Sequence, residues 1–261
     1  MNFYGLTYQD LERMCDGAPL LFNWHYKKNR RESCEHNNLS KRSRAVRAGL
    51  DFRLPAIRTV HQSADKTVKF LFEMEDGRRV ETVLIPFQGK YTICLSSQVG
   101  CAMACAFCHT GLQGFTRHLR ADEIVGQFVE AKRWLTENRP GDDRILNVVF
   151  MGQGEPLHNF DAVKTACGIF LSQHGLSLAV HKITVSTAGY LPGLERWKRE
   201  MPGVNVALSL HSTDPEKRGQ LIPLNKKYPL EKILPVVDAI PEGDKRFVTY
   251  EYMLIDGFND A

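Results

Sequence analysis

The chain has 261 residues, of which 43% are hydrophobic and 25% charged, and its formal net charge is +4. These values are ordinary for a soluble globular protein with one large or two modest domains. No apolar run is long enough to span a bilayer, and the N-terminal segment lacks the basic start and apolar stretch of a secretory signal. The sequence therefore predicts a cytoplasmic protein with no membrane partner.

The positive charge is concentrated at the N-terminus, where residues 1–60 carry 11 Lys and Arg against 6 Asp and Glu. The basic residues form two runs, Lys27, Lys28, Arg30 and Arg31, then Lys41, Arg42, Arg44 and Arg47. Such a segment suits a polyanion such as RNA, although charge alone favours a solvated helical surface. We expect residues 1–65 to form a basic, helical accessory module.

Residues 66–90 have the pattern of a β-hairpin. Val68, Phe70 and Phe72 alternate with residues of the opposite face, and Asp76-Gly77 offers a tight turn before the returning strand. This segment is expected to link the N-terminal module to the rest of the chain.

From residue 91 to residue 261 the pattern becomes strand, loop and helix, repeated. Strands are expected at 91–97, 145–151, 182–189, 205–212 and 248–255, and helices at 122–137, 163–171, 192–199 and 230–240. Alternation of this kind predicts an α/β fold with a parallel sheet, in which ligands gather at the carboxyl ends of the strands. Polar and glycine-rich residues follow these strands, as a binding site requires.

Three of the seven cysteines, Cys101, Cys105 and Cys108, lie in the loop after the first of these strands. Three thiolates on one short loop can bind three corners of a cubic iron–sulfur cluster, which leaves the fourth iron open to another ligand. A structural zinc site is the alternative. It needs a fourth ligand, and His109 is too close to Cys108 to complete a tetrahedral site easily.

The CxxxCxxC spacing at the end of the first strand resembles the signature of the radical S-adenosylmethionine (SAM) superfamily. The wider string CLSSQVGCAMACAFCHTGLQGFTRHLRADEIVGQ resembles the RlmN/Cfr family of RNA methyltransferases, and the resemblance extends densely over residues 66–261. Further matches are VETVLIP, NVVFMGQGEPLHNF, ITVSTAG, VALSLHS, IPLNKKYPLE and VTYEYMLIDGFND. Residues 1–60 match weakly, mainly through LTYQDLERM and NLSK.

The resemblance implies a partial (β/α) radical SAM barrel over residues 91–261, with five of the six expected strands. It implies methylation of C2 of an adenosine in 23S rRNA, with tRNA as a further substrate of the RlmN branch, and of C8 in the Cfr branch. The implied cofactors are a 4Fe–4S cluster and SAM. A monomer and an electron donor such as flavodoxin are also expected.

The resemblance assigns roles to individual residues. Cys101, Cys105 and Cys108 are implied as cluster ligands. The implied SAM contacts are Gly154, Glu155, Ser186, Ser209, Leu210 and His211. Cys94 matches one of two catalytic cysteines, which resolves a protein–RNA adduct by disulfide formation, and Glu81 matches the family's proton acceptor.

The match also has gaps. The family pattern continues for roughly a hundred residues beyond Ala261, with the last barrel strand and the methyl-carrying cysteine. We therefore expect a fragment or truncated product, or a chain that lacks the methyl-transfer half of this chemistry. Another kind of radical SAM enzyme and a non-catalytic RNA- or iron–sulfur-binding remnant remain the alternatives. Cys167 is expected in the core, and Cys15 and Cys34 receive no role.

Overall fold

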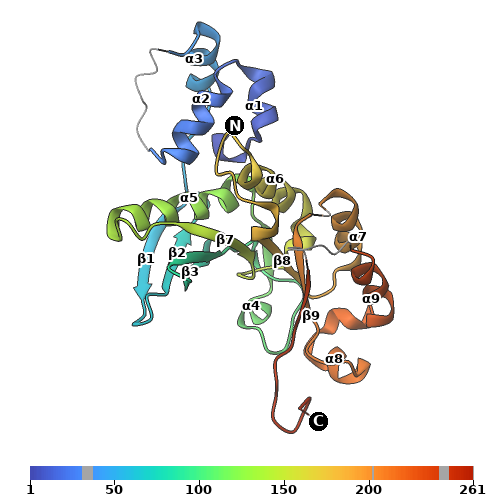
Figure 1. Cartoon of the computed structure of the whole chain (residues 1–261). Helices are drawn as coiled ribbons and strands as arrows, with labels where there is room; N and C mark the ends of the chain where they lie inside the picture. The colour runs from blue at the N-terminus through green and yellow to red at the C-terminus, as the bar shows by residue number, and fades with distance from the viewer. Residues whose placement is uncertain (31–37, 202, 241–246, 261) are drawn as a thin grey trace. The chain divides into compact units, whose positions relative to one another are not determined.

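The computed structural model describes residues 1–30, 38–201, 203–240 and 247–260 (Figure 1). The chain divides into two compact units that alternate along the sequence. Unit 1 comprises residues 1–93, 120–147 and 161–179, and unit 2 comprises residues 94–119, 148–160 and 180–261. The boundaries expected from sequence at residues 65 and 90 stay a prediction.

The N-terminal part of unit 1 is helical, as expected from the sequence. Its elements are η1 (Phe3–Gly5), α1 (Tyr8–Met14), α2 (Ala18–Phe22), the π-helical η2 (Asn23–Lys27) and α3 (Lys41–Ala48). A reciprocal cap starts α1, because Thr7 Oγ1 accepts from the backbone N–H of Asp10 while the Asp10 carboxylate accepts from that of Thr7. Buried aromatic rings, among them Phe3 and Phe22 at a centroid distance of 5.7 Å, hold these short helices together.

The predicted hairpin is present as β2 (Val68–Glu73) and β3 (Arg79–Phe87), which pair antiparallel. Val68, Phe70 and Phe72 all face the core, as their alternation indicates. Strand β1 (Ala56–Gln62), which pairs antiparallel with β2, was not expected. Four of its seven residues are exposed and none is buried, so the strand has no alternating hydrophobic signal.

Two long helices complete unit 1. Helix α5 (Ala121–Asn138) contacts α6 (Phe160–Leu171) through Phe128 and Phe170, whose ring centroids are 5.3 Å apart. The strand order in this unit is β1-β2-β3-β4, followed by the first half of β7; β4 spans Lys90–Cys94 and β7 spans Ile145–Phe150. No helix of the described ranges is both long and apolar enough to cross a membrane.

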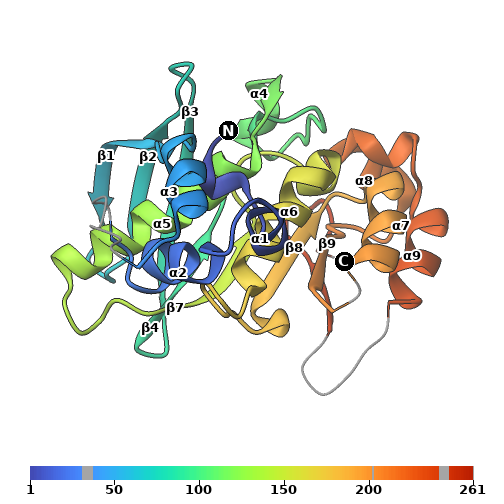
Figure 2. The same cartoon turned by 90° about the horizontal axis from the view of Figure 1, so that it is seen from above.

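Unit 2 contains the parallel strands on which the candidate site is built. The second half of β7 pairs with β8 (Ile183–Thr187), β8 with β9 (Asn205–Ser209), and β9 with β10 (Val248–Glu251). Helices α7 (Leu191–Glu200), α8 (Pro215–Leu221) and α9 (Leu230–Asp238) gather on one side of β8 and β9 (Figure 2).

The five predicted β/α strands are confirmed as β4, β7, β8, β9 and β10. Each ends at an earlier residue than expected, because the residues at its carboxyl end leave the ladder. The described strands form an open order that ends at β10, and no closed barrel is present among them. Strands β5 (Gln98–Gly100) and β6 (Phe115–His118) were not expected; they form a small antiparallel pair on either side of the cysteine loop.

Candidate functional site

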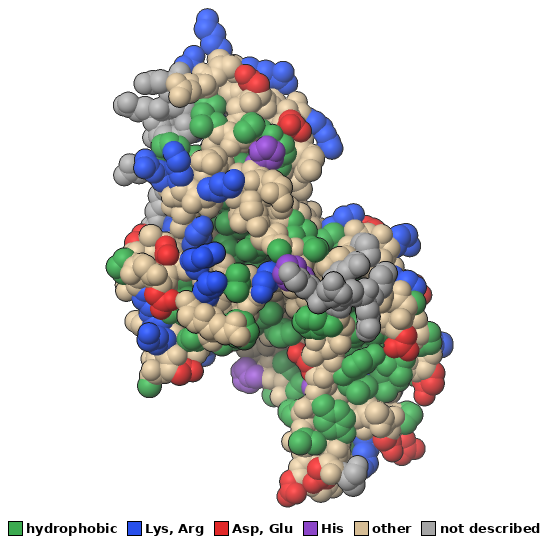
Figure 3. Space-filling view, viewed as in Figure 1, with side chains coloured by type: hydrophobic (Ala, Val, Ile, Leu, Met, Phe, Trp, Pro, Cys, Tyr) green, Lys and Arg blue, Asp and Glu red, His purple; other side chains and the backbone are tan. Residues whose placement is uncertain are grey.

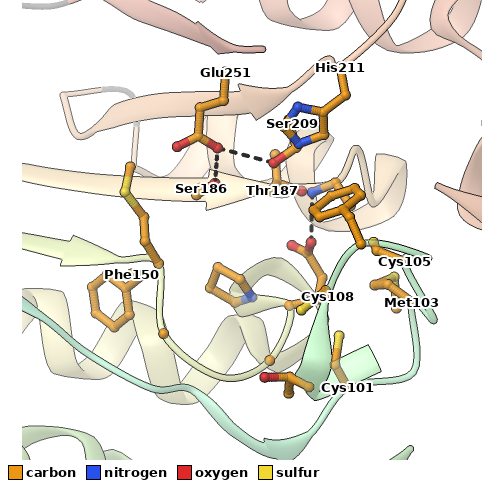
Figure 4. A pocket seen from close by; sticks show the side chains of 18 of the residues that line it. Cys101, Met103, Cys105, Cys108, Phe150, Ser186, Thr187, Ser209, His211 and Glu251 are labelled. Carbon is orange, nitrogen blue, oxygen red and sulfur yellow. Dashed lines mark hydrogen bonds between the residues drawn. The ribbon is translucent and has the colours of Figure 1, made fainter. Parts of the chain in front are cut away.

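A pocket of about 410 Å³ lies at the carboxyl ends of the parallel strands of unit 2. This volume is within the range of small-molecule sites. The cysteine loop, the turn after β7 and the ends of β8, β9 and β10 all contribute to it (Figure 4). The predicted site residues that line it are Cys101, Cys105, Cys108, Gly154, Glu155, Ser186, Ser209 and His211.

Backbone hydrogen bonds hold the cysteine loop closed at its base. The N–H of Cys101 donates to the carbonyl of Gly114 at 3.0 Å, and the N–H of Ala106 donates to that of Leu221 at 2.9 Å. Gly100 has a φ of +73°, and a Cβ there would lie 1.8 Å from the Gly114 carbonyl oxygen. Only glycine fits this close approach, so the loop depends on it.

Cys101 and Cys105 pack against a cluster of buried apolar residues, Met103, Ala188, Leu221 and Ile222. Burial raises the pKa of Cys101 to about 11 and that of Cys105 to about 12, and the negative charges of Glu155 and the neighbouring cysteines raise both further. A bound iron cluster supplies the positive charge that would stabilise these groups as thiolates. Three thiols that share one pocket and influence one another electrostatically therefore fit a cluster.

The arrangement differs from that of a mononuclear metal site. Among the described residues, no group of three or more His, Cys, Asp or Glu side chains could hold a single metal ion. A cubic cluster sets another requirement, because each thiolate binds a different iron atom and the three need not meet at one point.

The turn after β7 places a buried carboxyl group beside this loop. Gly154 has a φ of +99°, and a Cβ there would lie 2.4 Å from that of Gln98. Gln98 Oε1 accepts from the N–H of Glu155 at 2.8 Å, and Glu155 in turn accepts from the N–H groups of Leu157 at 3.0 Å and Ala188 at 2.8 Å. Burial raises the pKa of Glu155 to about 7.

The serine residues predicted at the ends of β8 and β9 share a partner that sequence reasoning missed. Glu251 of β10 accepts from Ser186 Oγ at 2.8 Å and from Ser209 Oγ at 3.1 Å, both at Oε2 (Figure 4). It also lines the pocket. The only sequence signal was its position in VTYEYMLI, in a strand whose end was expected at the site.

His211 is held in one orientation by its neighbours. Its φ is +56°, its backbone N–H donates to the carbonyl of Glu251, and its Nδ1 accepts from the N–H of Met253 at 3.1 Å. The neutral ring therefore carries its proton on Nε2. Leu210 does not line the pocket; its carbonyl accepts from Arg218 Nε at 3.1 Å.

Arg218 is the second residue that the sequence did not indicate. Its guanidinium is fully buried and donates to the carbonyls of Ala188, Ser209 and Leu210, which follow or end β8 and β9. It also donates to Asn225 Oδ1 at 2.6 Å. Burial lowers its pKa to about 10. This side chain fixes the strand ends that carry the pocket serines.

The two residues expected to be catalytic are not among the pocket-lining residues. Cys94 ends β4, and burial raises its pKa to about 11, with a smaller contribution from the negative charge of Glu251. Glu81 belongs to β3 of unit 1, where its carboxylate pairs with Lys69 Nζ at 2.9 Å. Cys167 is fully buried in α6, as expected, and Cys34 lies outside the described residues.

Comparison with known proteins places the chain in a family. The model of the radical SAM superfamily matches residues 95–261. A "Dual-specificity RNA methyltransferase RlmN" from Pelobacter propionicus is 43% identical over 247 residues, which cover 94% of this chain and 68% of that protein. The protein of the same name from Desulfotalea psychrophila is 45% identical over 207 residues, 77% of this chain and 57% of that protein.

Structural comparison agrees. A crystal structure of a radical SAM methyltransferase from Sphaerobacter thermophilus superposes with a TM-score of 0.89 at 37% identity, covering 100% of this chain and 78% of that one. The fold and the site thus define a radical SAM enzyme. Within that superfamily, the chain belongs to the RlmN-type RNA methyltransferases.

Proposed function

We propose that this protein binds a 4Fe–4S cluster through Cys101, Cys105 and Cys108, binds SAM in the adjoining pocket, and methylates C2 of adenosine in 23S rRNA and tRNA. The observation that carries the proposal is the convergence of the three thiols, the Gly154-Glu155 turn and the strand-end serines on one pocket of about 410 Å³. Chemistry at the open iron and recognition of SAM need these groups at the same place.

The pocket residues have distinct roles in this proposal. The reduced cluster, when bound, supplies the electron that cleaves a carbon–sulfur bond of SAM. Glu155 is buried, and its pKa is raised. In this proposal it accepts hydrogen bonds from the SAM ammonium group, whose positive charge stabilises the carboxylate form. Ser186, Ser209 and His211 orient the remainder of SAM through hydrogen bonds, and Phe107, which packs on His211 with ring centroids 4.7 Å apart, shields it from water.

We assign Glu81 as the proton acceptor and Cys94 as the cysteine that would release the RNA by forming a disulfide with the methyl-carrying cysteine, whose bond to the RNA methyl carbon breaks in that step. The methyl-carrying cysteine is not among these 261 residues. Cys94 reacts as a thiolate, and its high pKa means that a base must remove its proton when it acts. The proposed partners are an electron donor of the flavodoxin type and the RNA, with a monomeric enzyme in the cytoplasm.

The N-terminal helices carry the proposed RNA-docking surface. Lys and Arg side chains gather over them on the face seen in Figure 3. Lys27, Lys28 and Arg30 are exposed, and the last two lie over the Trp24 ring at 5.2 and 4.7 Å. The fourth basic residue of this run, Arg31, lies outside the described residues.

Each phosphate contact releases counterions, so that the affinity for RNA should fall steeply with salt. Changing Lys27, Lys28 and Arg30 to Ser together should weaken binding and flatten the dependence on salt. A variant with three other exposed cations changed to Ser is the control for net charge: Lys66 and Arg78 in the turns that flank β2, and Lys232 of α9. An unchanged salt slope in the first variant would place RNA binding elsewhere.

The function itself is tested by anaerobic reconstitution with iron and sulfide. The protein should show the broad violet absorbance of a 4Fe–4S cluster and, after reduction, release 5′-deoxyadenosine from SAM. The methyl-carrying cysteine of the family pattern is not among these 261 residues, so incubation of this chain with unmodified rRNA and tRNA should yield no 2-methyladenosine by nucleoside mass spectrometry. Stoichiometric zinc with no iron would contradict the proposal at its first step. Absence of 2-methyladenosine from a reaction with a protein that includes the methyl-carrying cysteine would contradict it at its last.

A further inference from the structure

Arg218 is a buried cation whose hydrogen-bond partners are all neutral. Its guanidinium donates to three backbone carbonyls and to Oδ1 of Asn225, and its side chain is fully buried. Among the residues that the structure describes, no carboxylate forms an ion pair with it. A guanidinium stays charged at neutral pH, and a buried charge without a counter-ion is costly. The described fold therefore contains a positive charge that its own carboxylates do not neutralise.

The contacts of α8 place this charge next to the cysteine loop. The helix that carries Arg218 ends at Leu221, whose carbonyl accepts from the N–H of Ala106 at 2.9 Å. Ala188, whose carbonyl accepts from Arg218 Nη2 at 2.9 Å, lies with Leu221 in the apolar cluster against which Cys105 packs. Apolar surroundings screen charges less than water does. Burial lowers the pKa of Arg218 to about 10, and a negative charge on Cys105 counteracts this effect.

Arg218 does not itself line the pocket, so a bound ligand does not touch it. Glu155, the buried carboxyl group of the pocket, accepts from the N–H of Ala188 and receives no hydrogen bond from Arg218. The guanidinium can therefore influence the site only through its electric field. An iron–sulfur cluster held by three thiolates carries a net negative charge, and reduction by one electron adds another. A fixed cation nearby stabilises the reduced form more than the oxidised form.

We propose that Arg218 is the internal counter-charge of the reduced cluster and raises its reduction potential. This inference rests on the proposed binding of the cluster by the three cysteines of the loop. The carbonyl groups that accept from Arg218 hold the guanidinium in one place, so that little of the protein has to reorient when the electron arrives.

The proposal is tested by redox titration of the anaerobically reconstituted protein, with the electron paramagnetic resonance signal of the reduced cluster as the readout. Dithionite supplies one electron to each cluster and is itself oxidised. Arg218→Gln removes the charge and should lower the ratio of reduced to oxidised cluster at a given potential about tenfold, which is about 59 mV for a one-electron couple. Arg218→Lys keeps the charge but loses most of the hydrogen bonds, and it should lower the ratio less than about threefold.

A second substitution tests the charge while Arg218 stays in place. Asn225→Asp puts a carboxylate where Asn225 Oδ1 already accepts from Arg218 Nη1 at 2.6 Å. It gives up one hydrogen bond, from Asn225 Nδ2 to the Pro215 carbonyl at 3.1 Å. Because it neutralises the guanidinium, it should lower the ratio by a factor similar to that of Arg218→Gln. Lys226→Gln removes an exposed cation from the next residue and is the matched control; water and salt screen that charge, so the ratio should stay the same.

An unchanged potential in Arg218→Gln and Asn225→Asp would overturn the proposal. A higher potential in Arg218→Gln would also overturn it, because solvent entry and lost packing would then outweigh the charge. If Arg218→Gln folds poorly, Asn225→Asp decides the question, since it retains the guanidinium and its bonds to the carbonyls. An unchanged protein that binds no cluster would remove the proposed function at its first step. A cluster whose potential is the same in all variants would leave that function intact and overturn only this inference.

Discussion

Carboxylates in the two units have opposite surroundings. On β2 of unit 1, Glu73 accepts from two guanidinium groups, those of Arg58 and Arg79, and these hydrogen bonds lower its pKa. In the pocket of unit 2, Glu155 and Glu251 bond only to backbone N–H or hydroxyl groups among the described residues. The hairpin carboxylate is neutralised within the fold, whereas the pocket carboxylates keep their capacity for a ligand.

The difference shows that unit 2 keeps buried carboxyl groups whose charged form is destabilised by burial, and that unit 1 does not do so at Glu73. Burying a carboxyl group without a cation disfavours its charged form, and the pKa of Glu155 is raised accordingly. A carboxylate that is paired with arginine near the surface, such as Glu73, stays charged at little cost, and its ion pairs contribute little to stability. Matched substitutions in the two units therefore test whether the polar groups of unit 2 serve binding and those of unit 1 only solubility and folding.

The largest contrast is expected between two cysteines. Cys105→Ala should abolish the violet absorbance of the reconstituted protein, because two thiolates cannot hold the cluster. Cys167→Ala, in the core of α6, should cost about 1 kcal/mol of stability and leave the absorbance intact. Iron analysis and absorption spectra of both variants measure this, and a Cys105→Ala protein with a full iron content would refute the ligand assignment.

Two arginines give the next contrast. Arg218→Met should lower the free energy of unfolding by about 3 kcal/mol or more, because several buried carbonyls lose their donor. Arg58→Met, on the surface of β1, should change it little, since exposed ion pairs contribute weakly. Urea unfolding of the two variants measures the difference. Similar losses would show that the strand ends do not depend on Arg218.

Two glycines separate backbone strain from packing. Gly77 has a φ of +76°, and no atom lies within 4 Å of the position that an added methyl group would take, so Gly77→Ala should cost about 1 kcal/mol. Gly154→Ala adds an overlap with Gln98 at 2.4 Å and should cost about 2–4 kcal/mol. It should also weaken SAM binding, which Gly77→Ala should not. Thermal unfolding and SAM titration measure the two effects.

The smallest effect concerns pH. His118 and His158 both face Gln98 Nε2, at 3.0 and 3.2 Å, and burial lowers the pKa of each. Below an ordinary histidine pKa of about 6.5, the unfolded chain therefore binds more protons at these two residues than the folded chain does. Their contribution to the free energy of unfolding is complete above that pH. It is lost as the pH falls toward the lowered pKa values of the folded protein.

Urea unfolding at about pH 7.5 and about pH 5.5 measures this loss. A double variant with His118→Asn and His158→Asn should lose less stability between the two conditions than the unchanged protein. Parallel losses in both proteins would assign the pH dependence to other groups.

Much of the architecture was predictable, because the spacing of apolar residues along a strand or helix shows which of its faces is buried. Val68, Phe70 and Phe72 indicated the hairpin, and the apolar runs indicated β7, β8 and β9. β1 was missed because its residues are largely exposed, and β5 and β6 were missed because strands of three and four residues are too short to show a period. The spacing of Cys101, Cys105 and Cys108 indicated the cluster site, since ligands on one loop are close in sequence.

The sequence by itself determined the family, the order of strands and helices, and the residues that gather at the strand ends, because these depend on local pattern and motif. Only the tertiary structure decided the roles of Glu251 and Arg218. Glu251 meets Ser186 across 65 residues of chain, and Arg218 meets Ala188 across 30. A carboxylate in a strand and an arginine in a short helix carry no local sign of such partners, because parallel strands and their crossover helices alone bring them together.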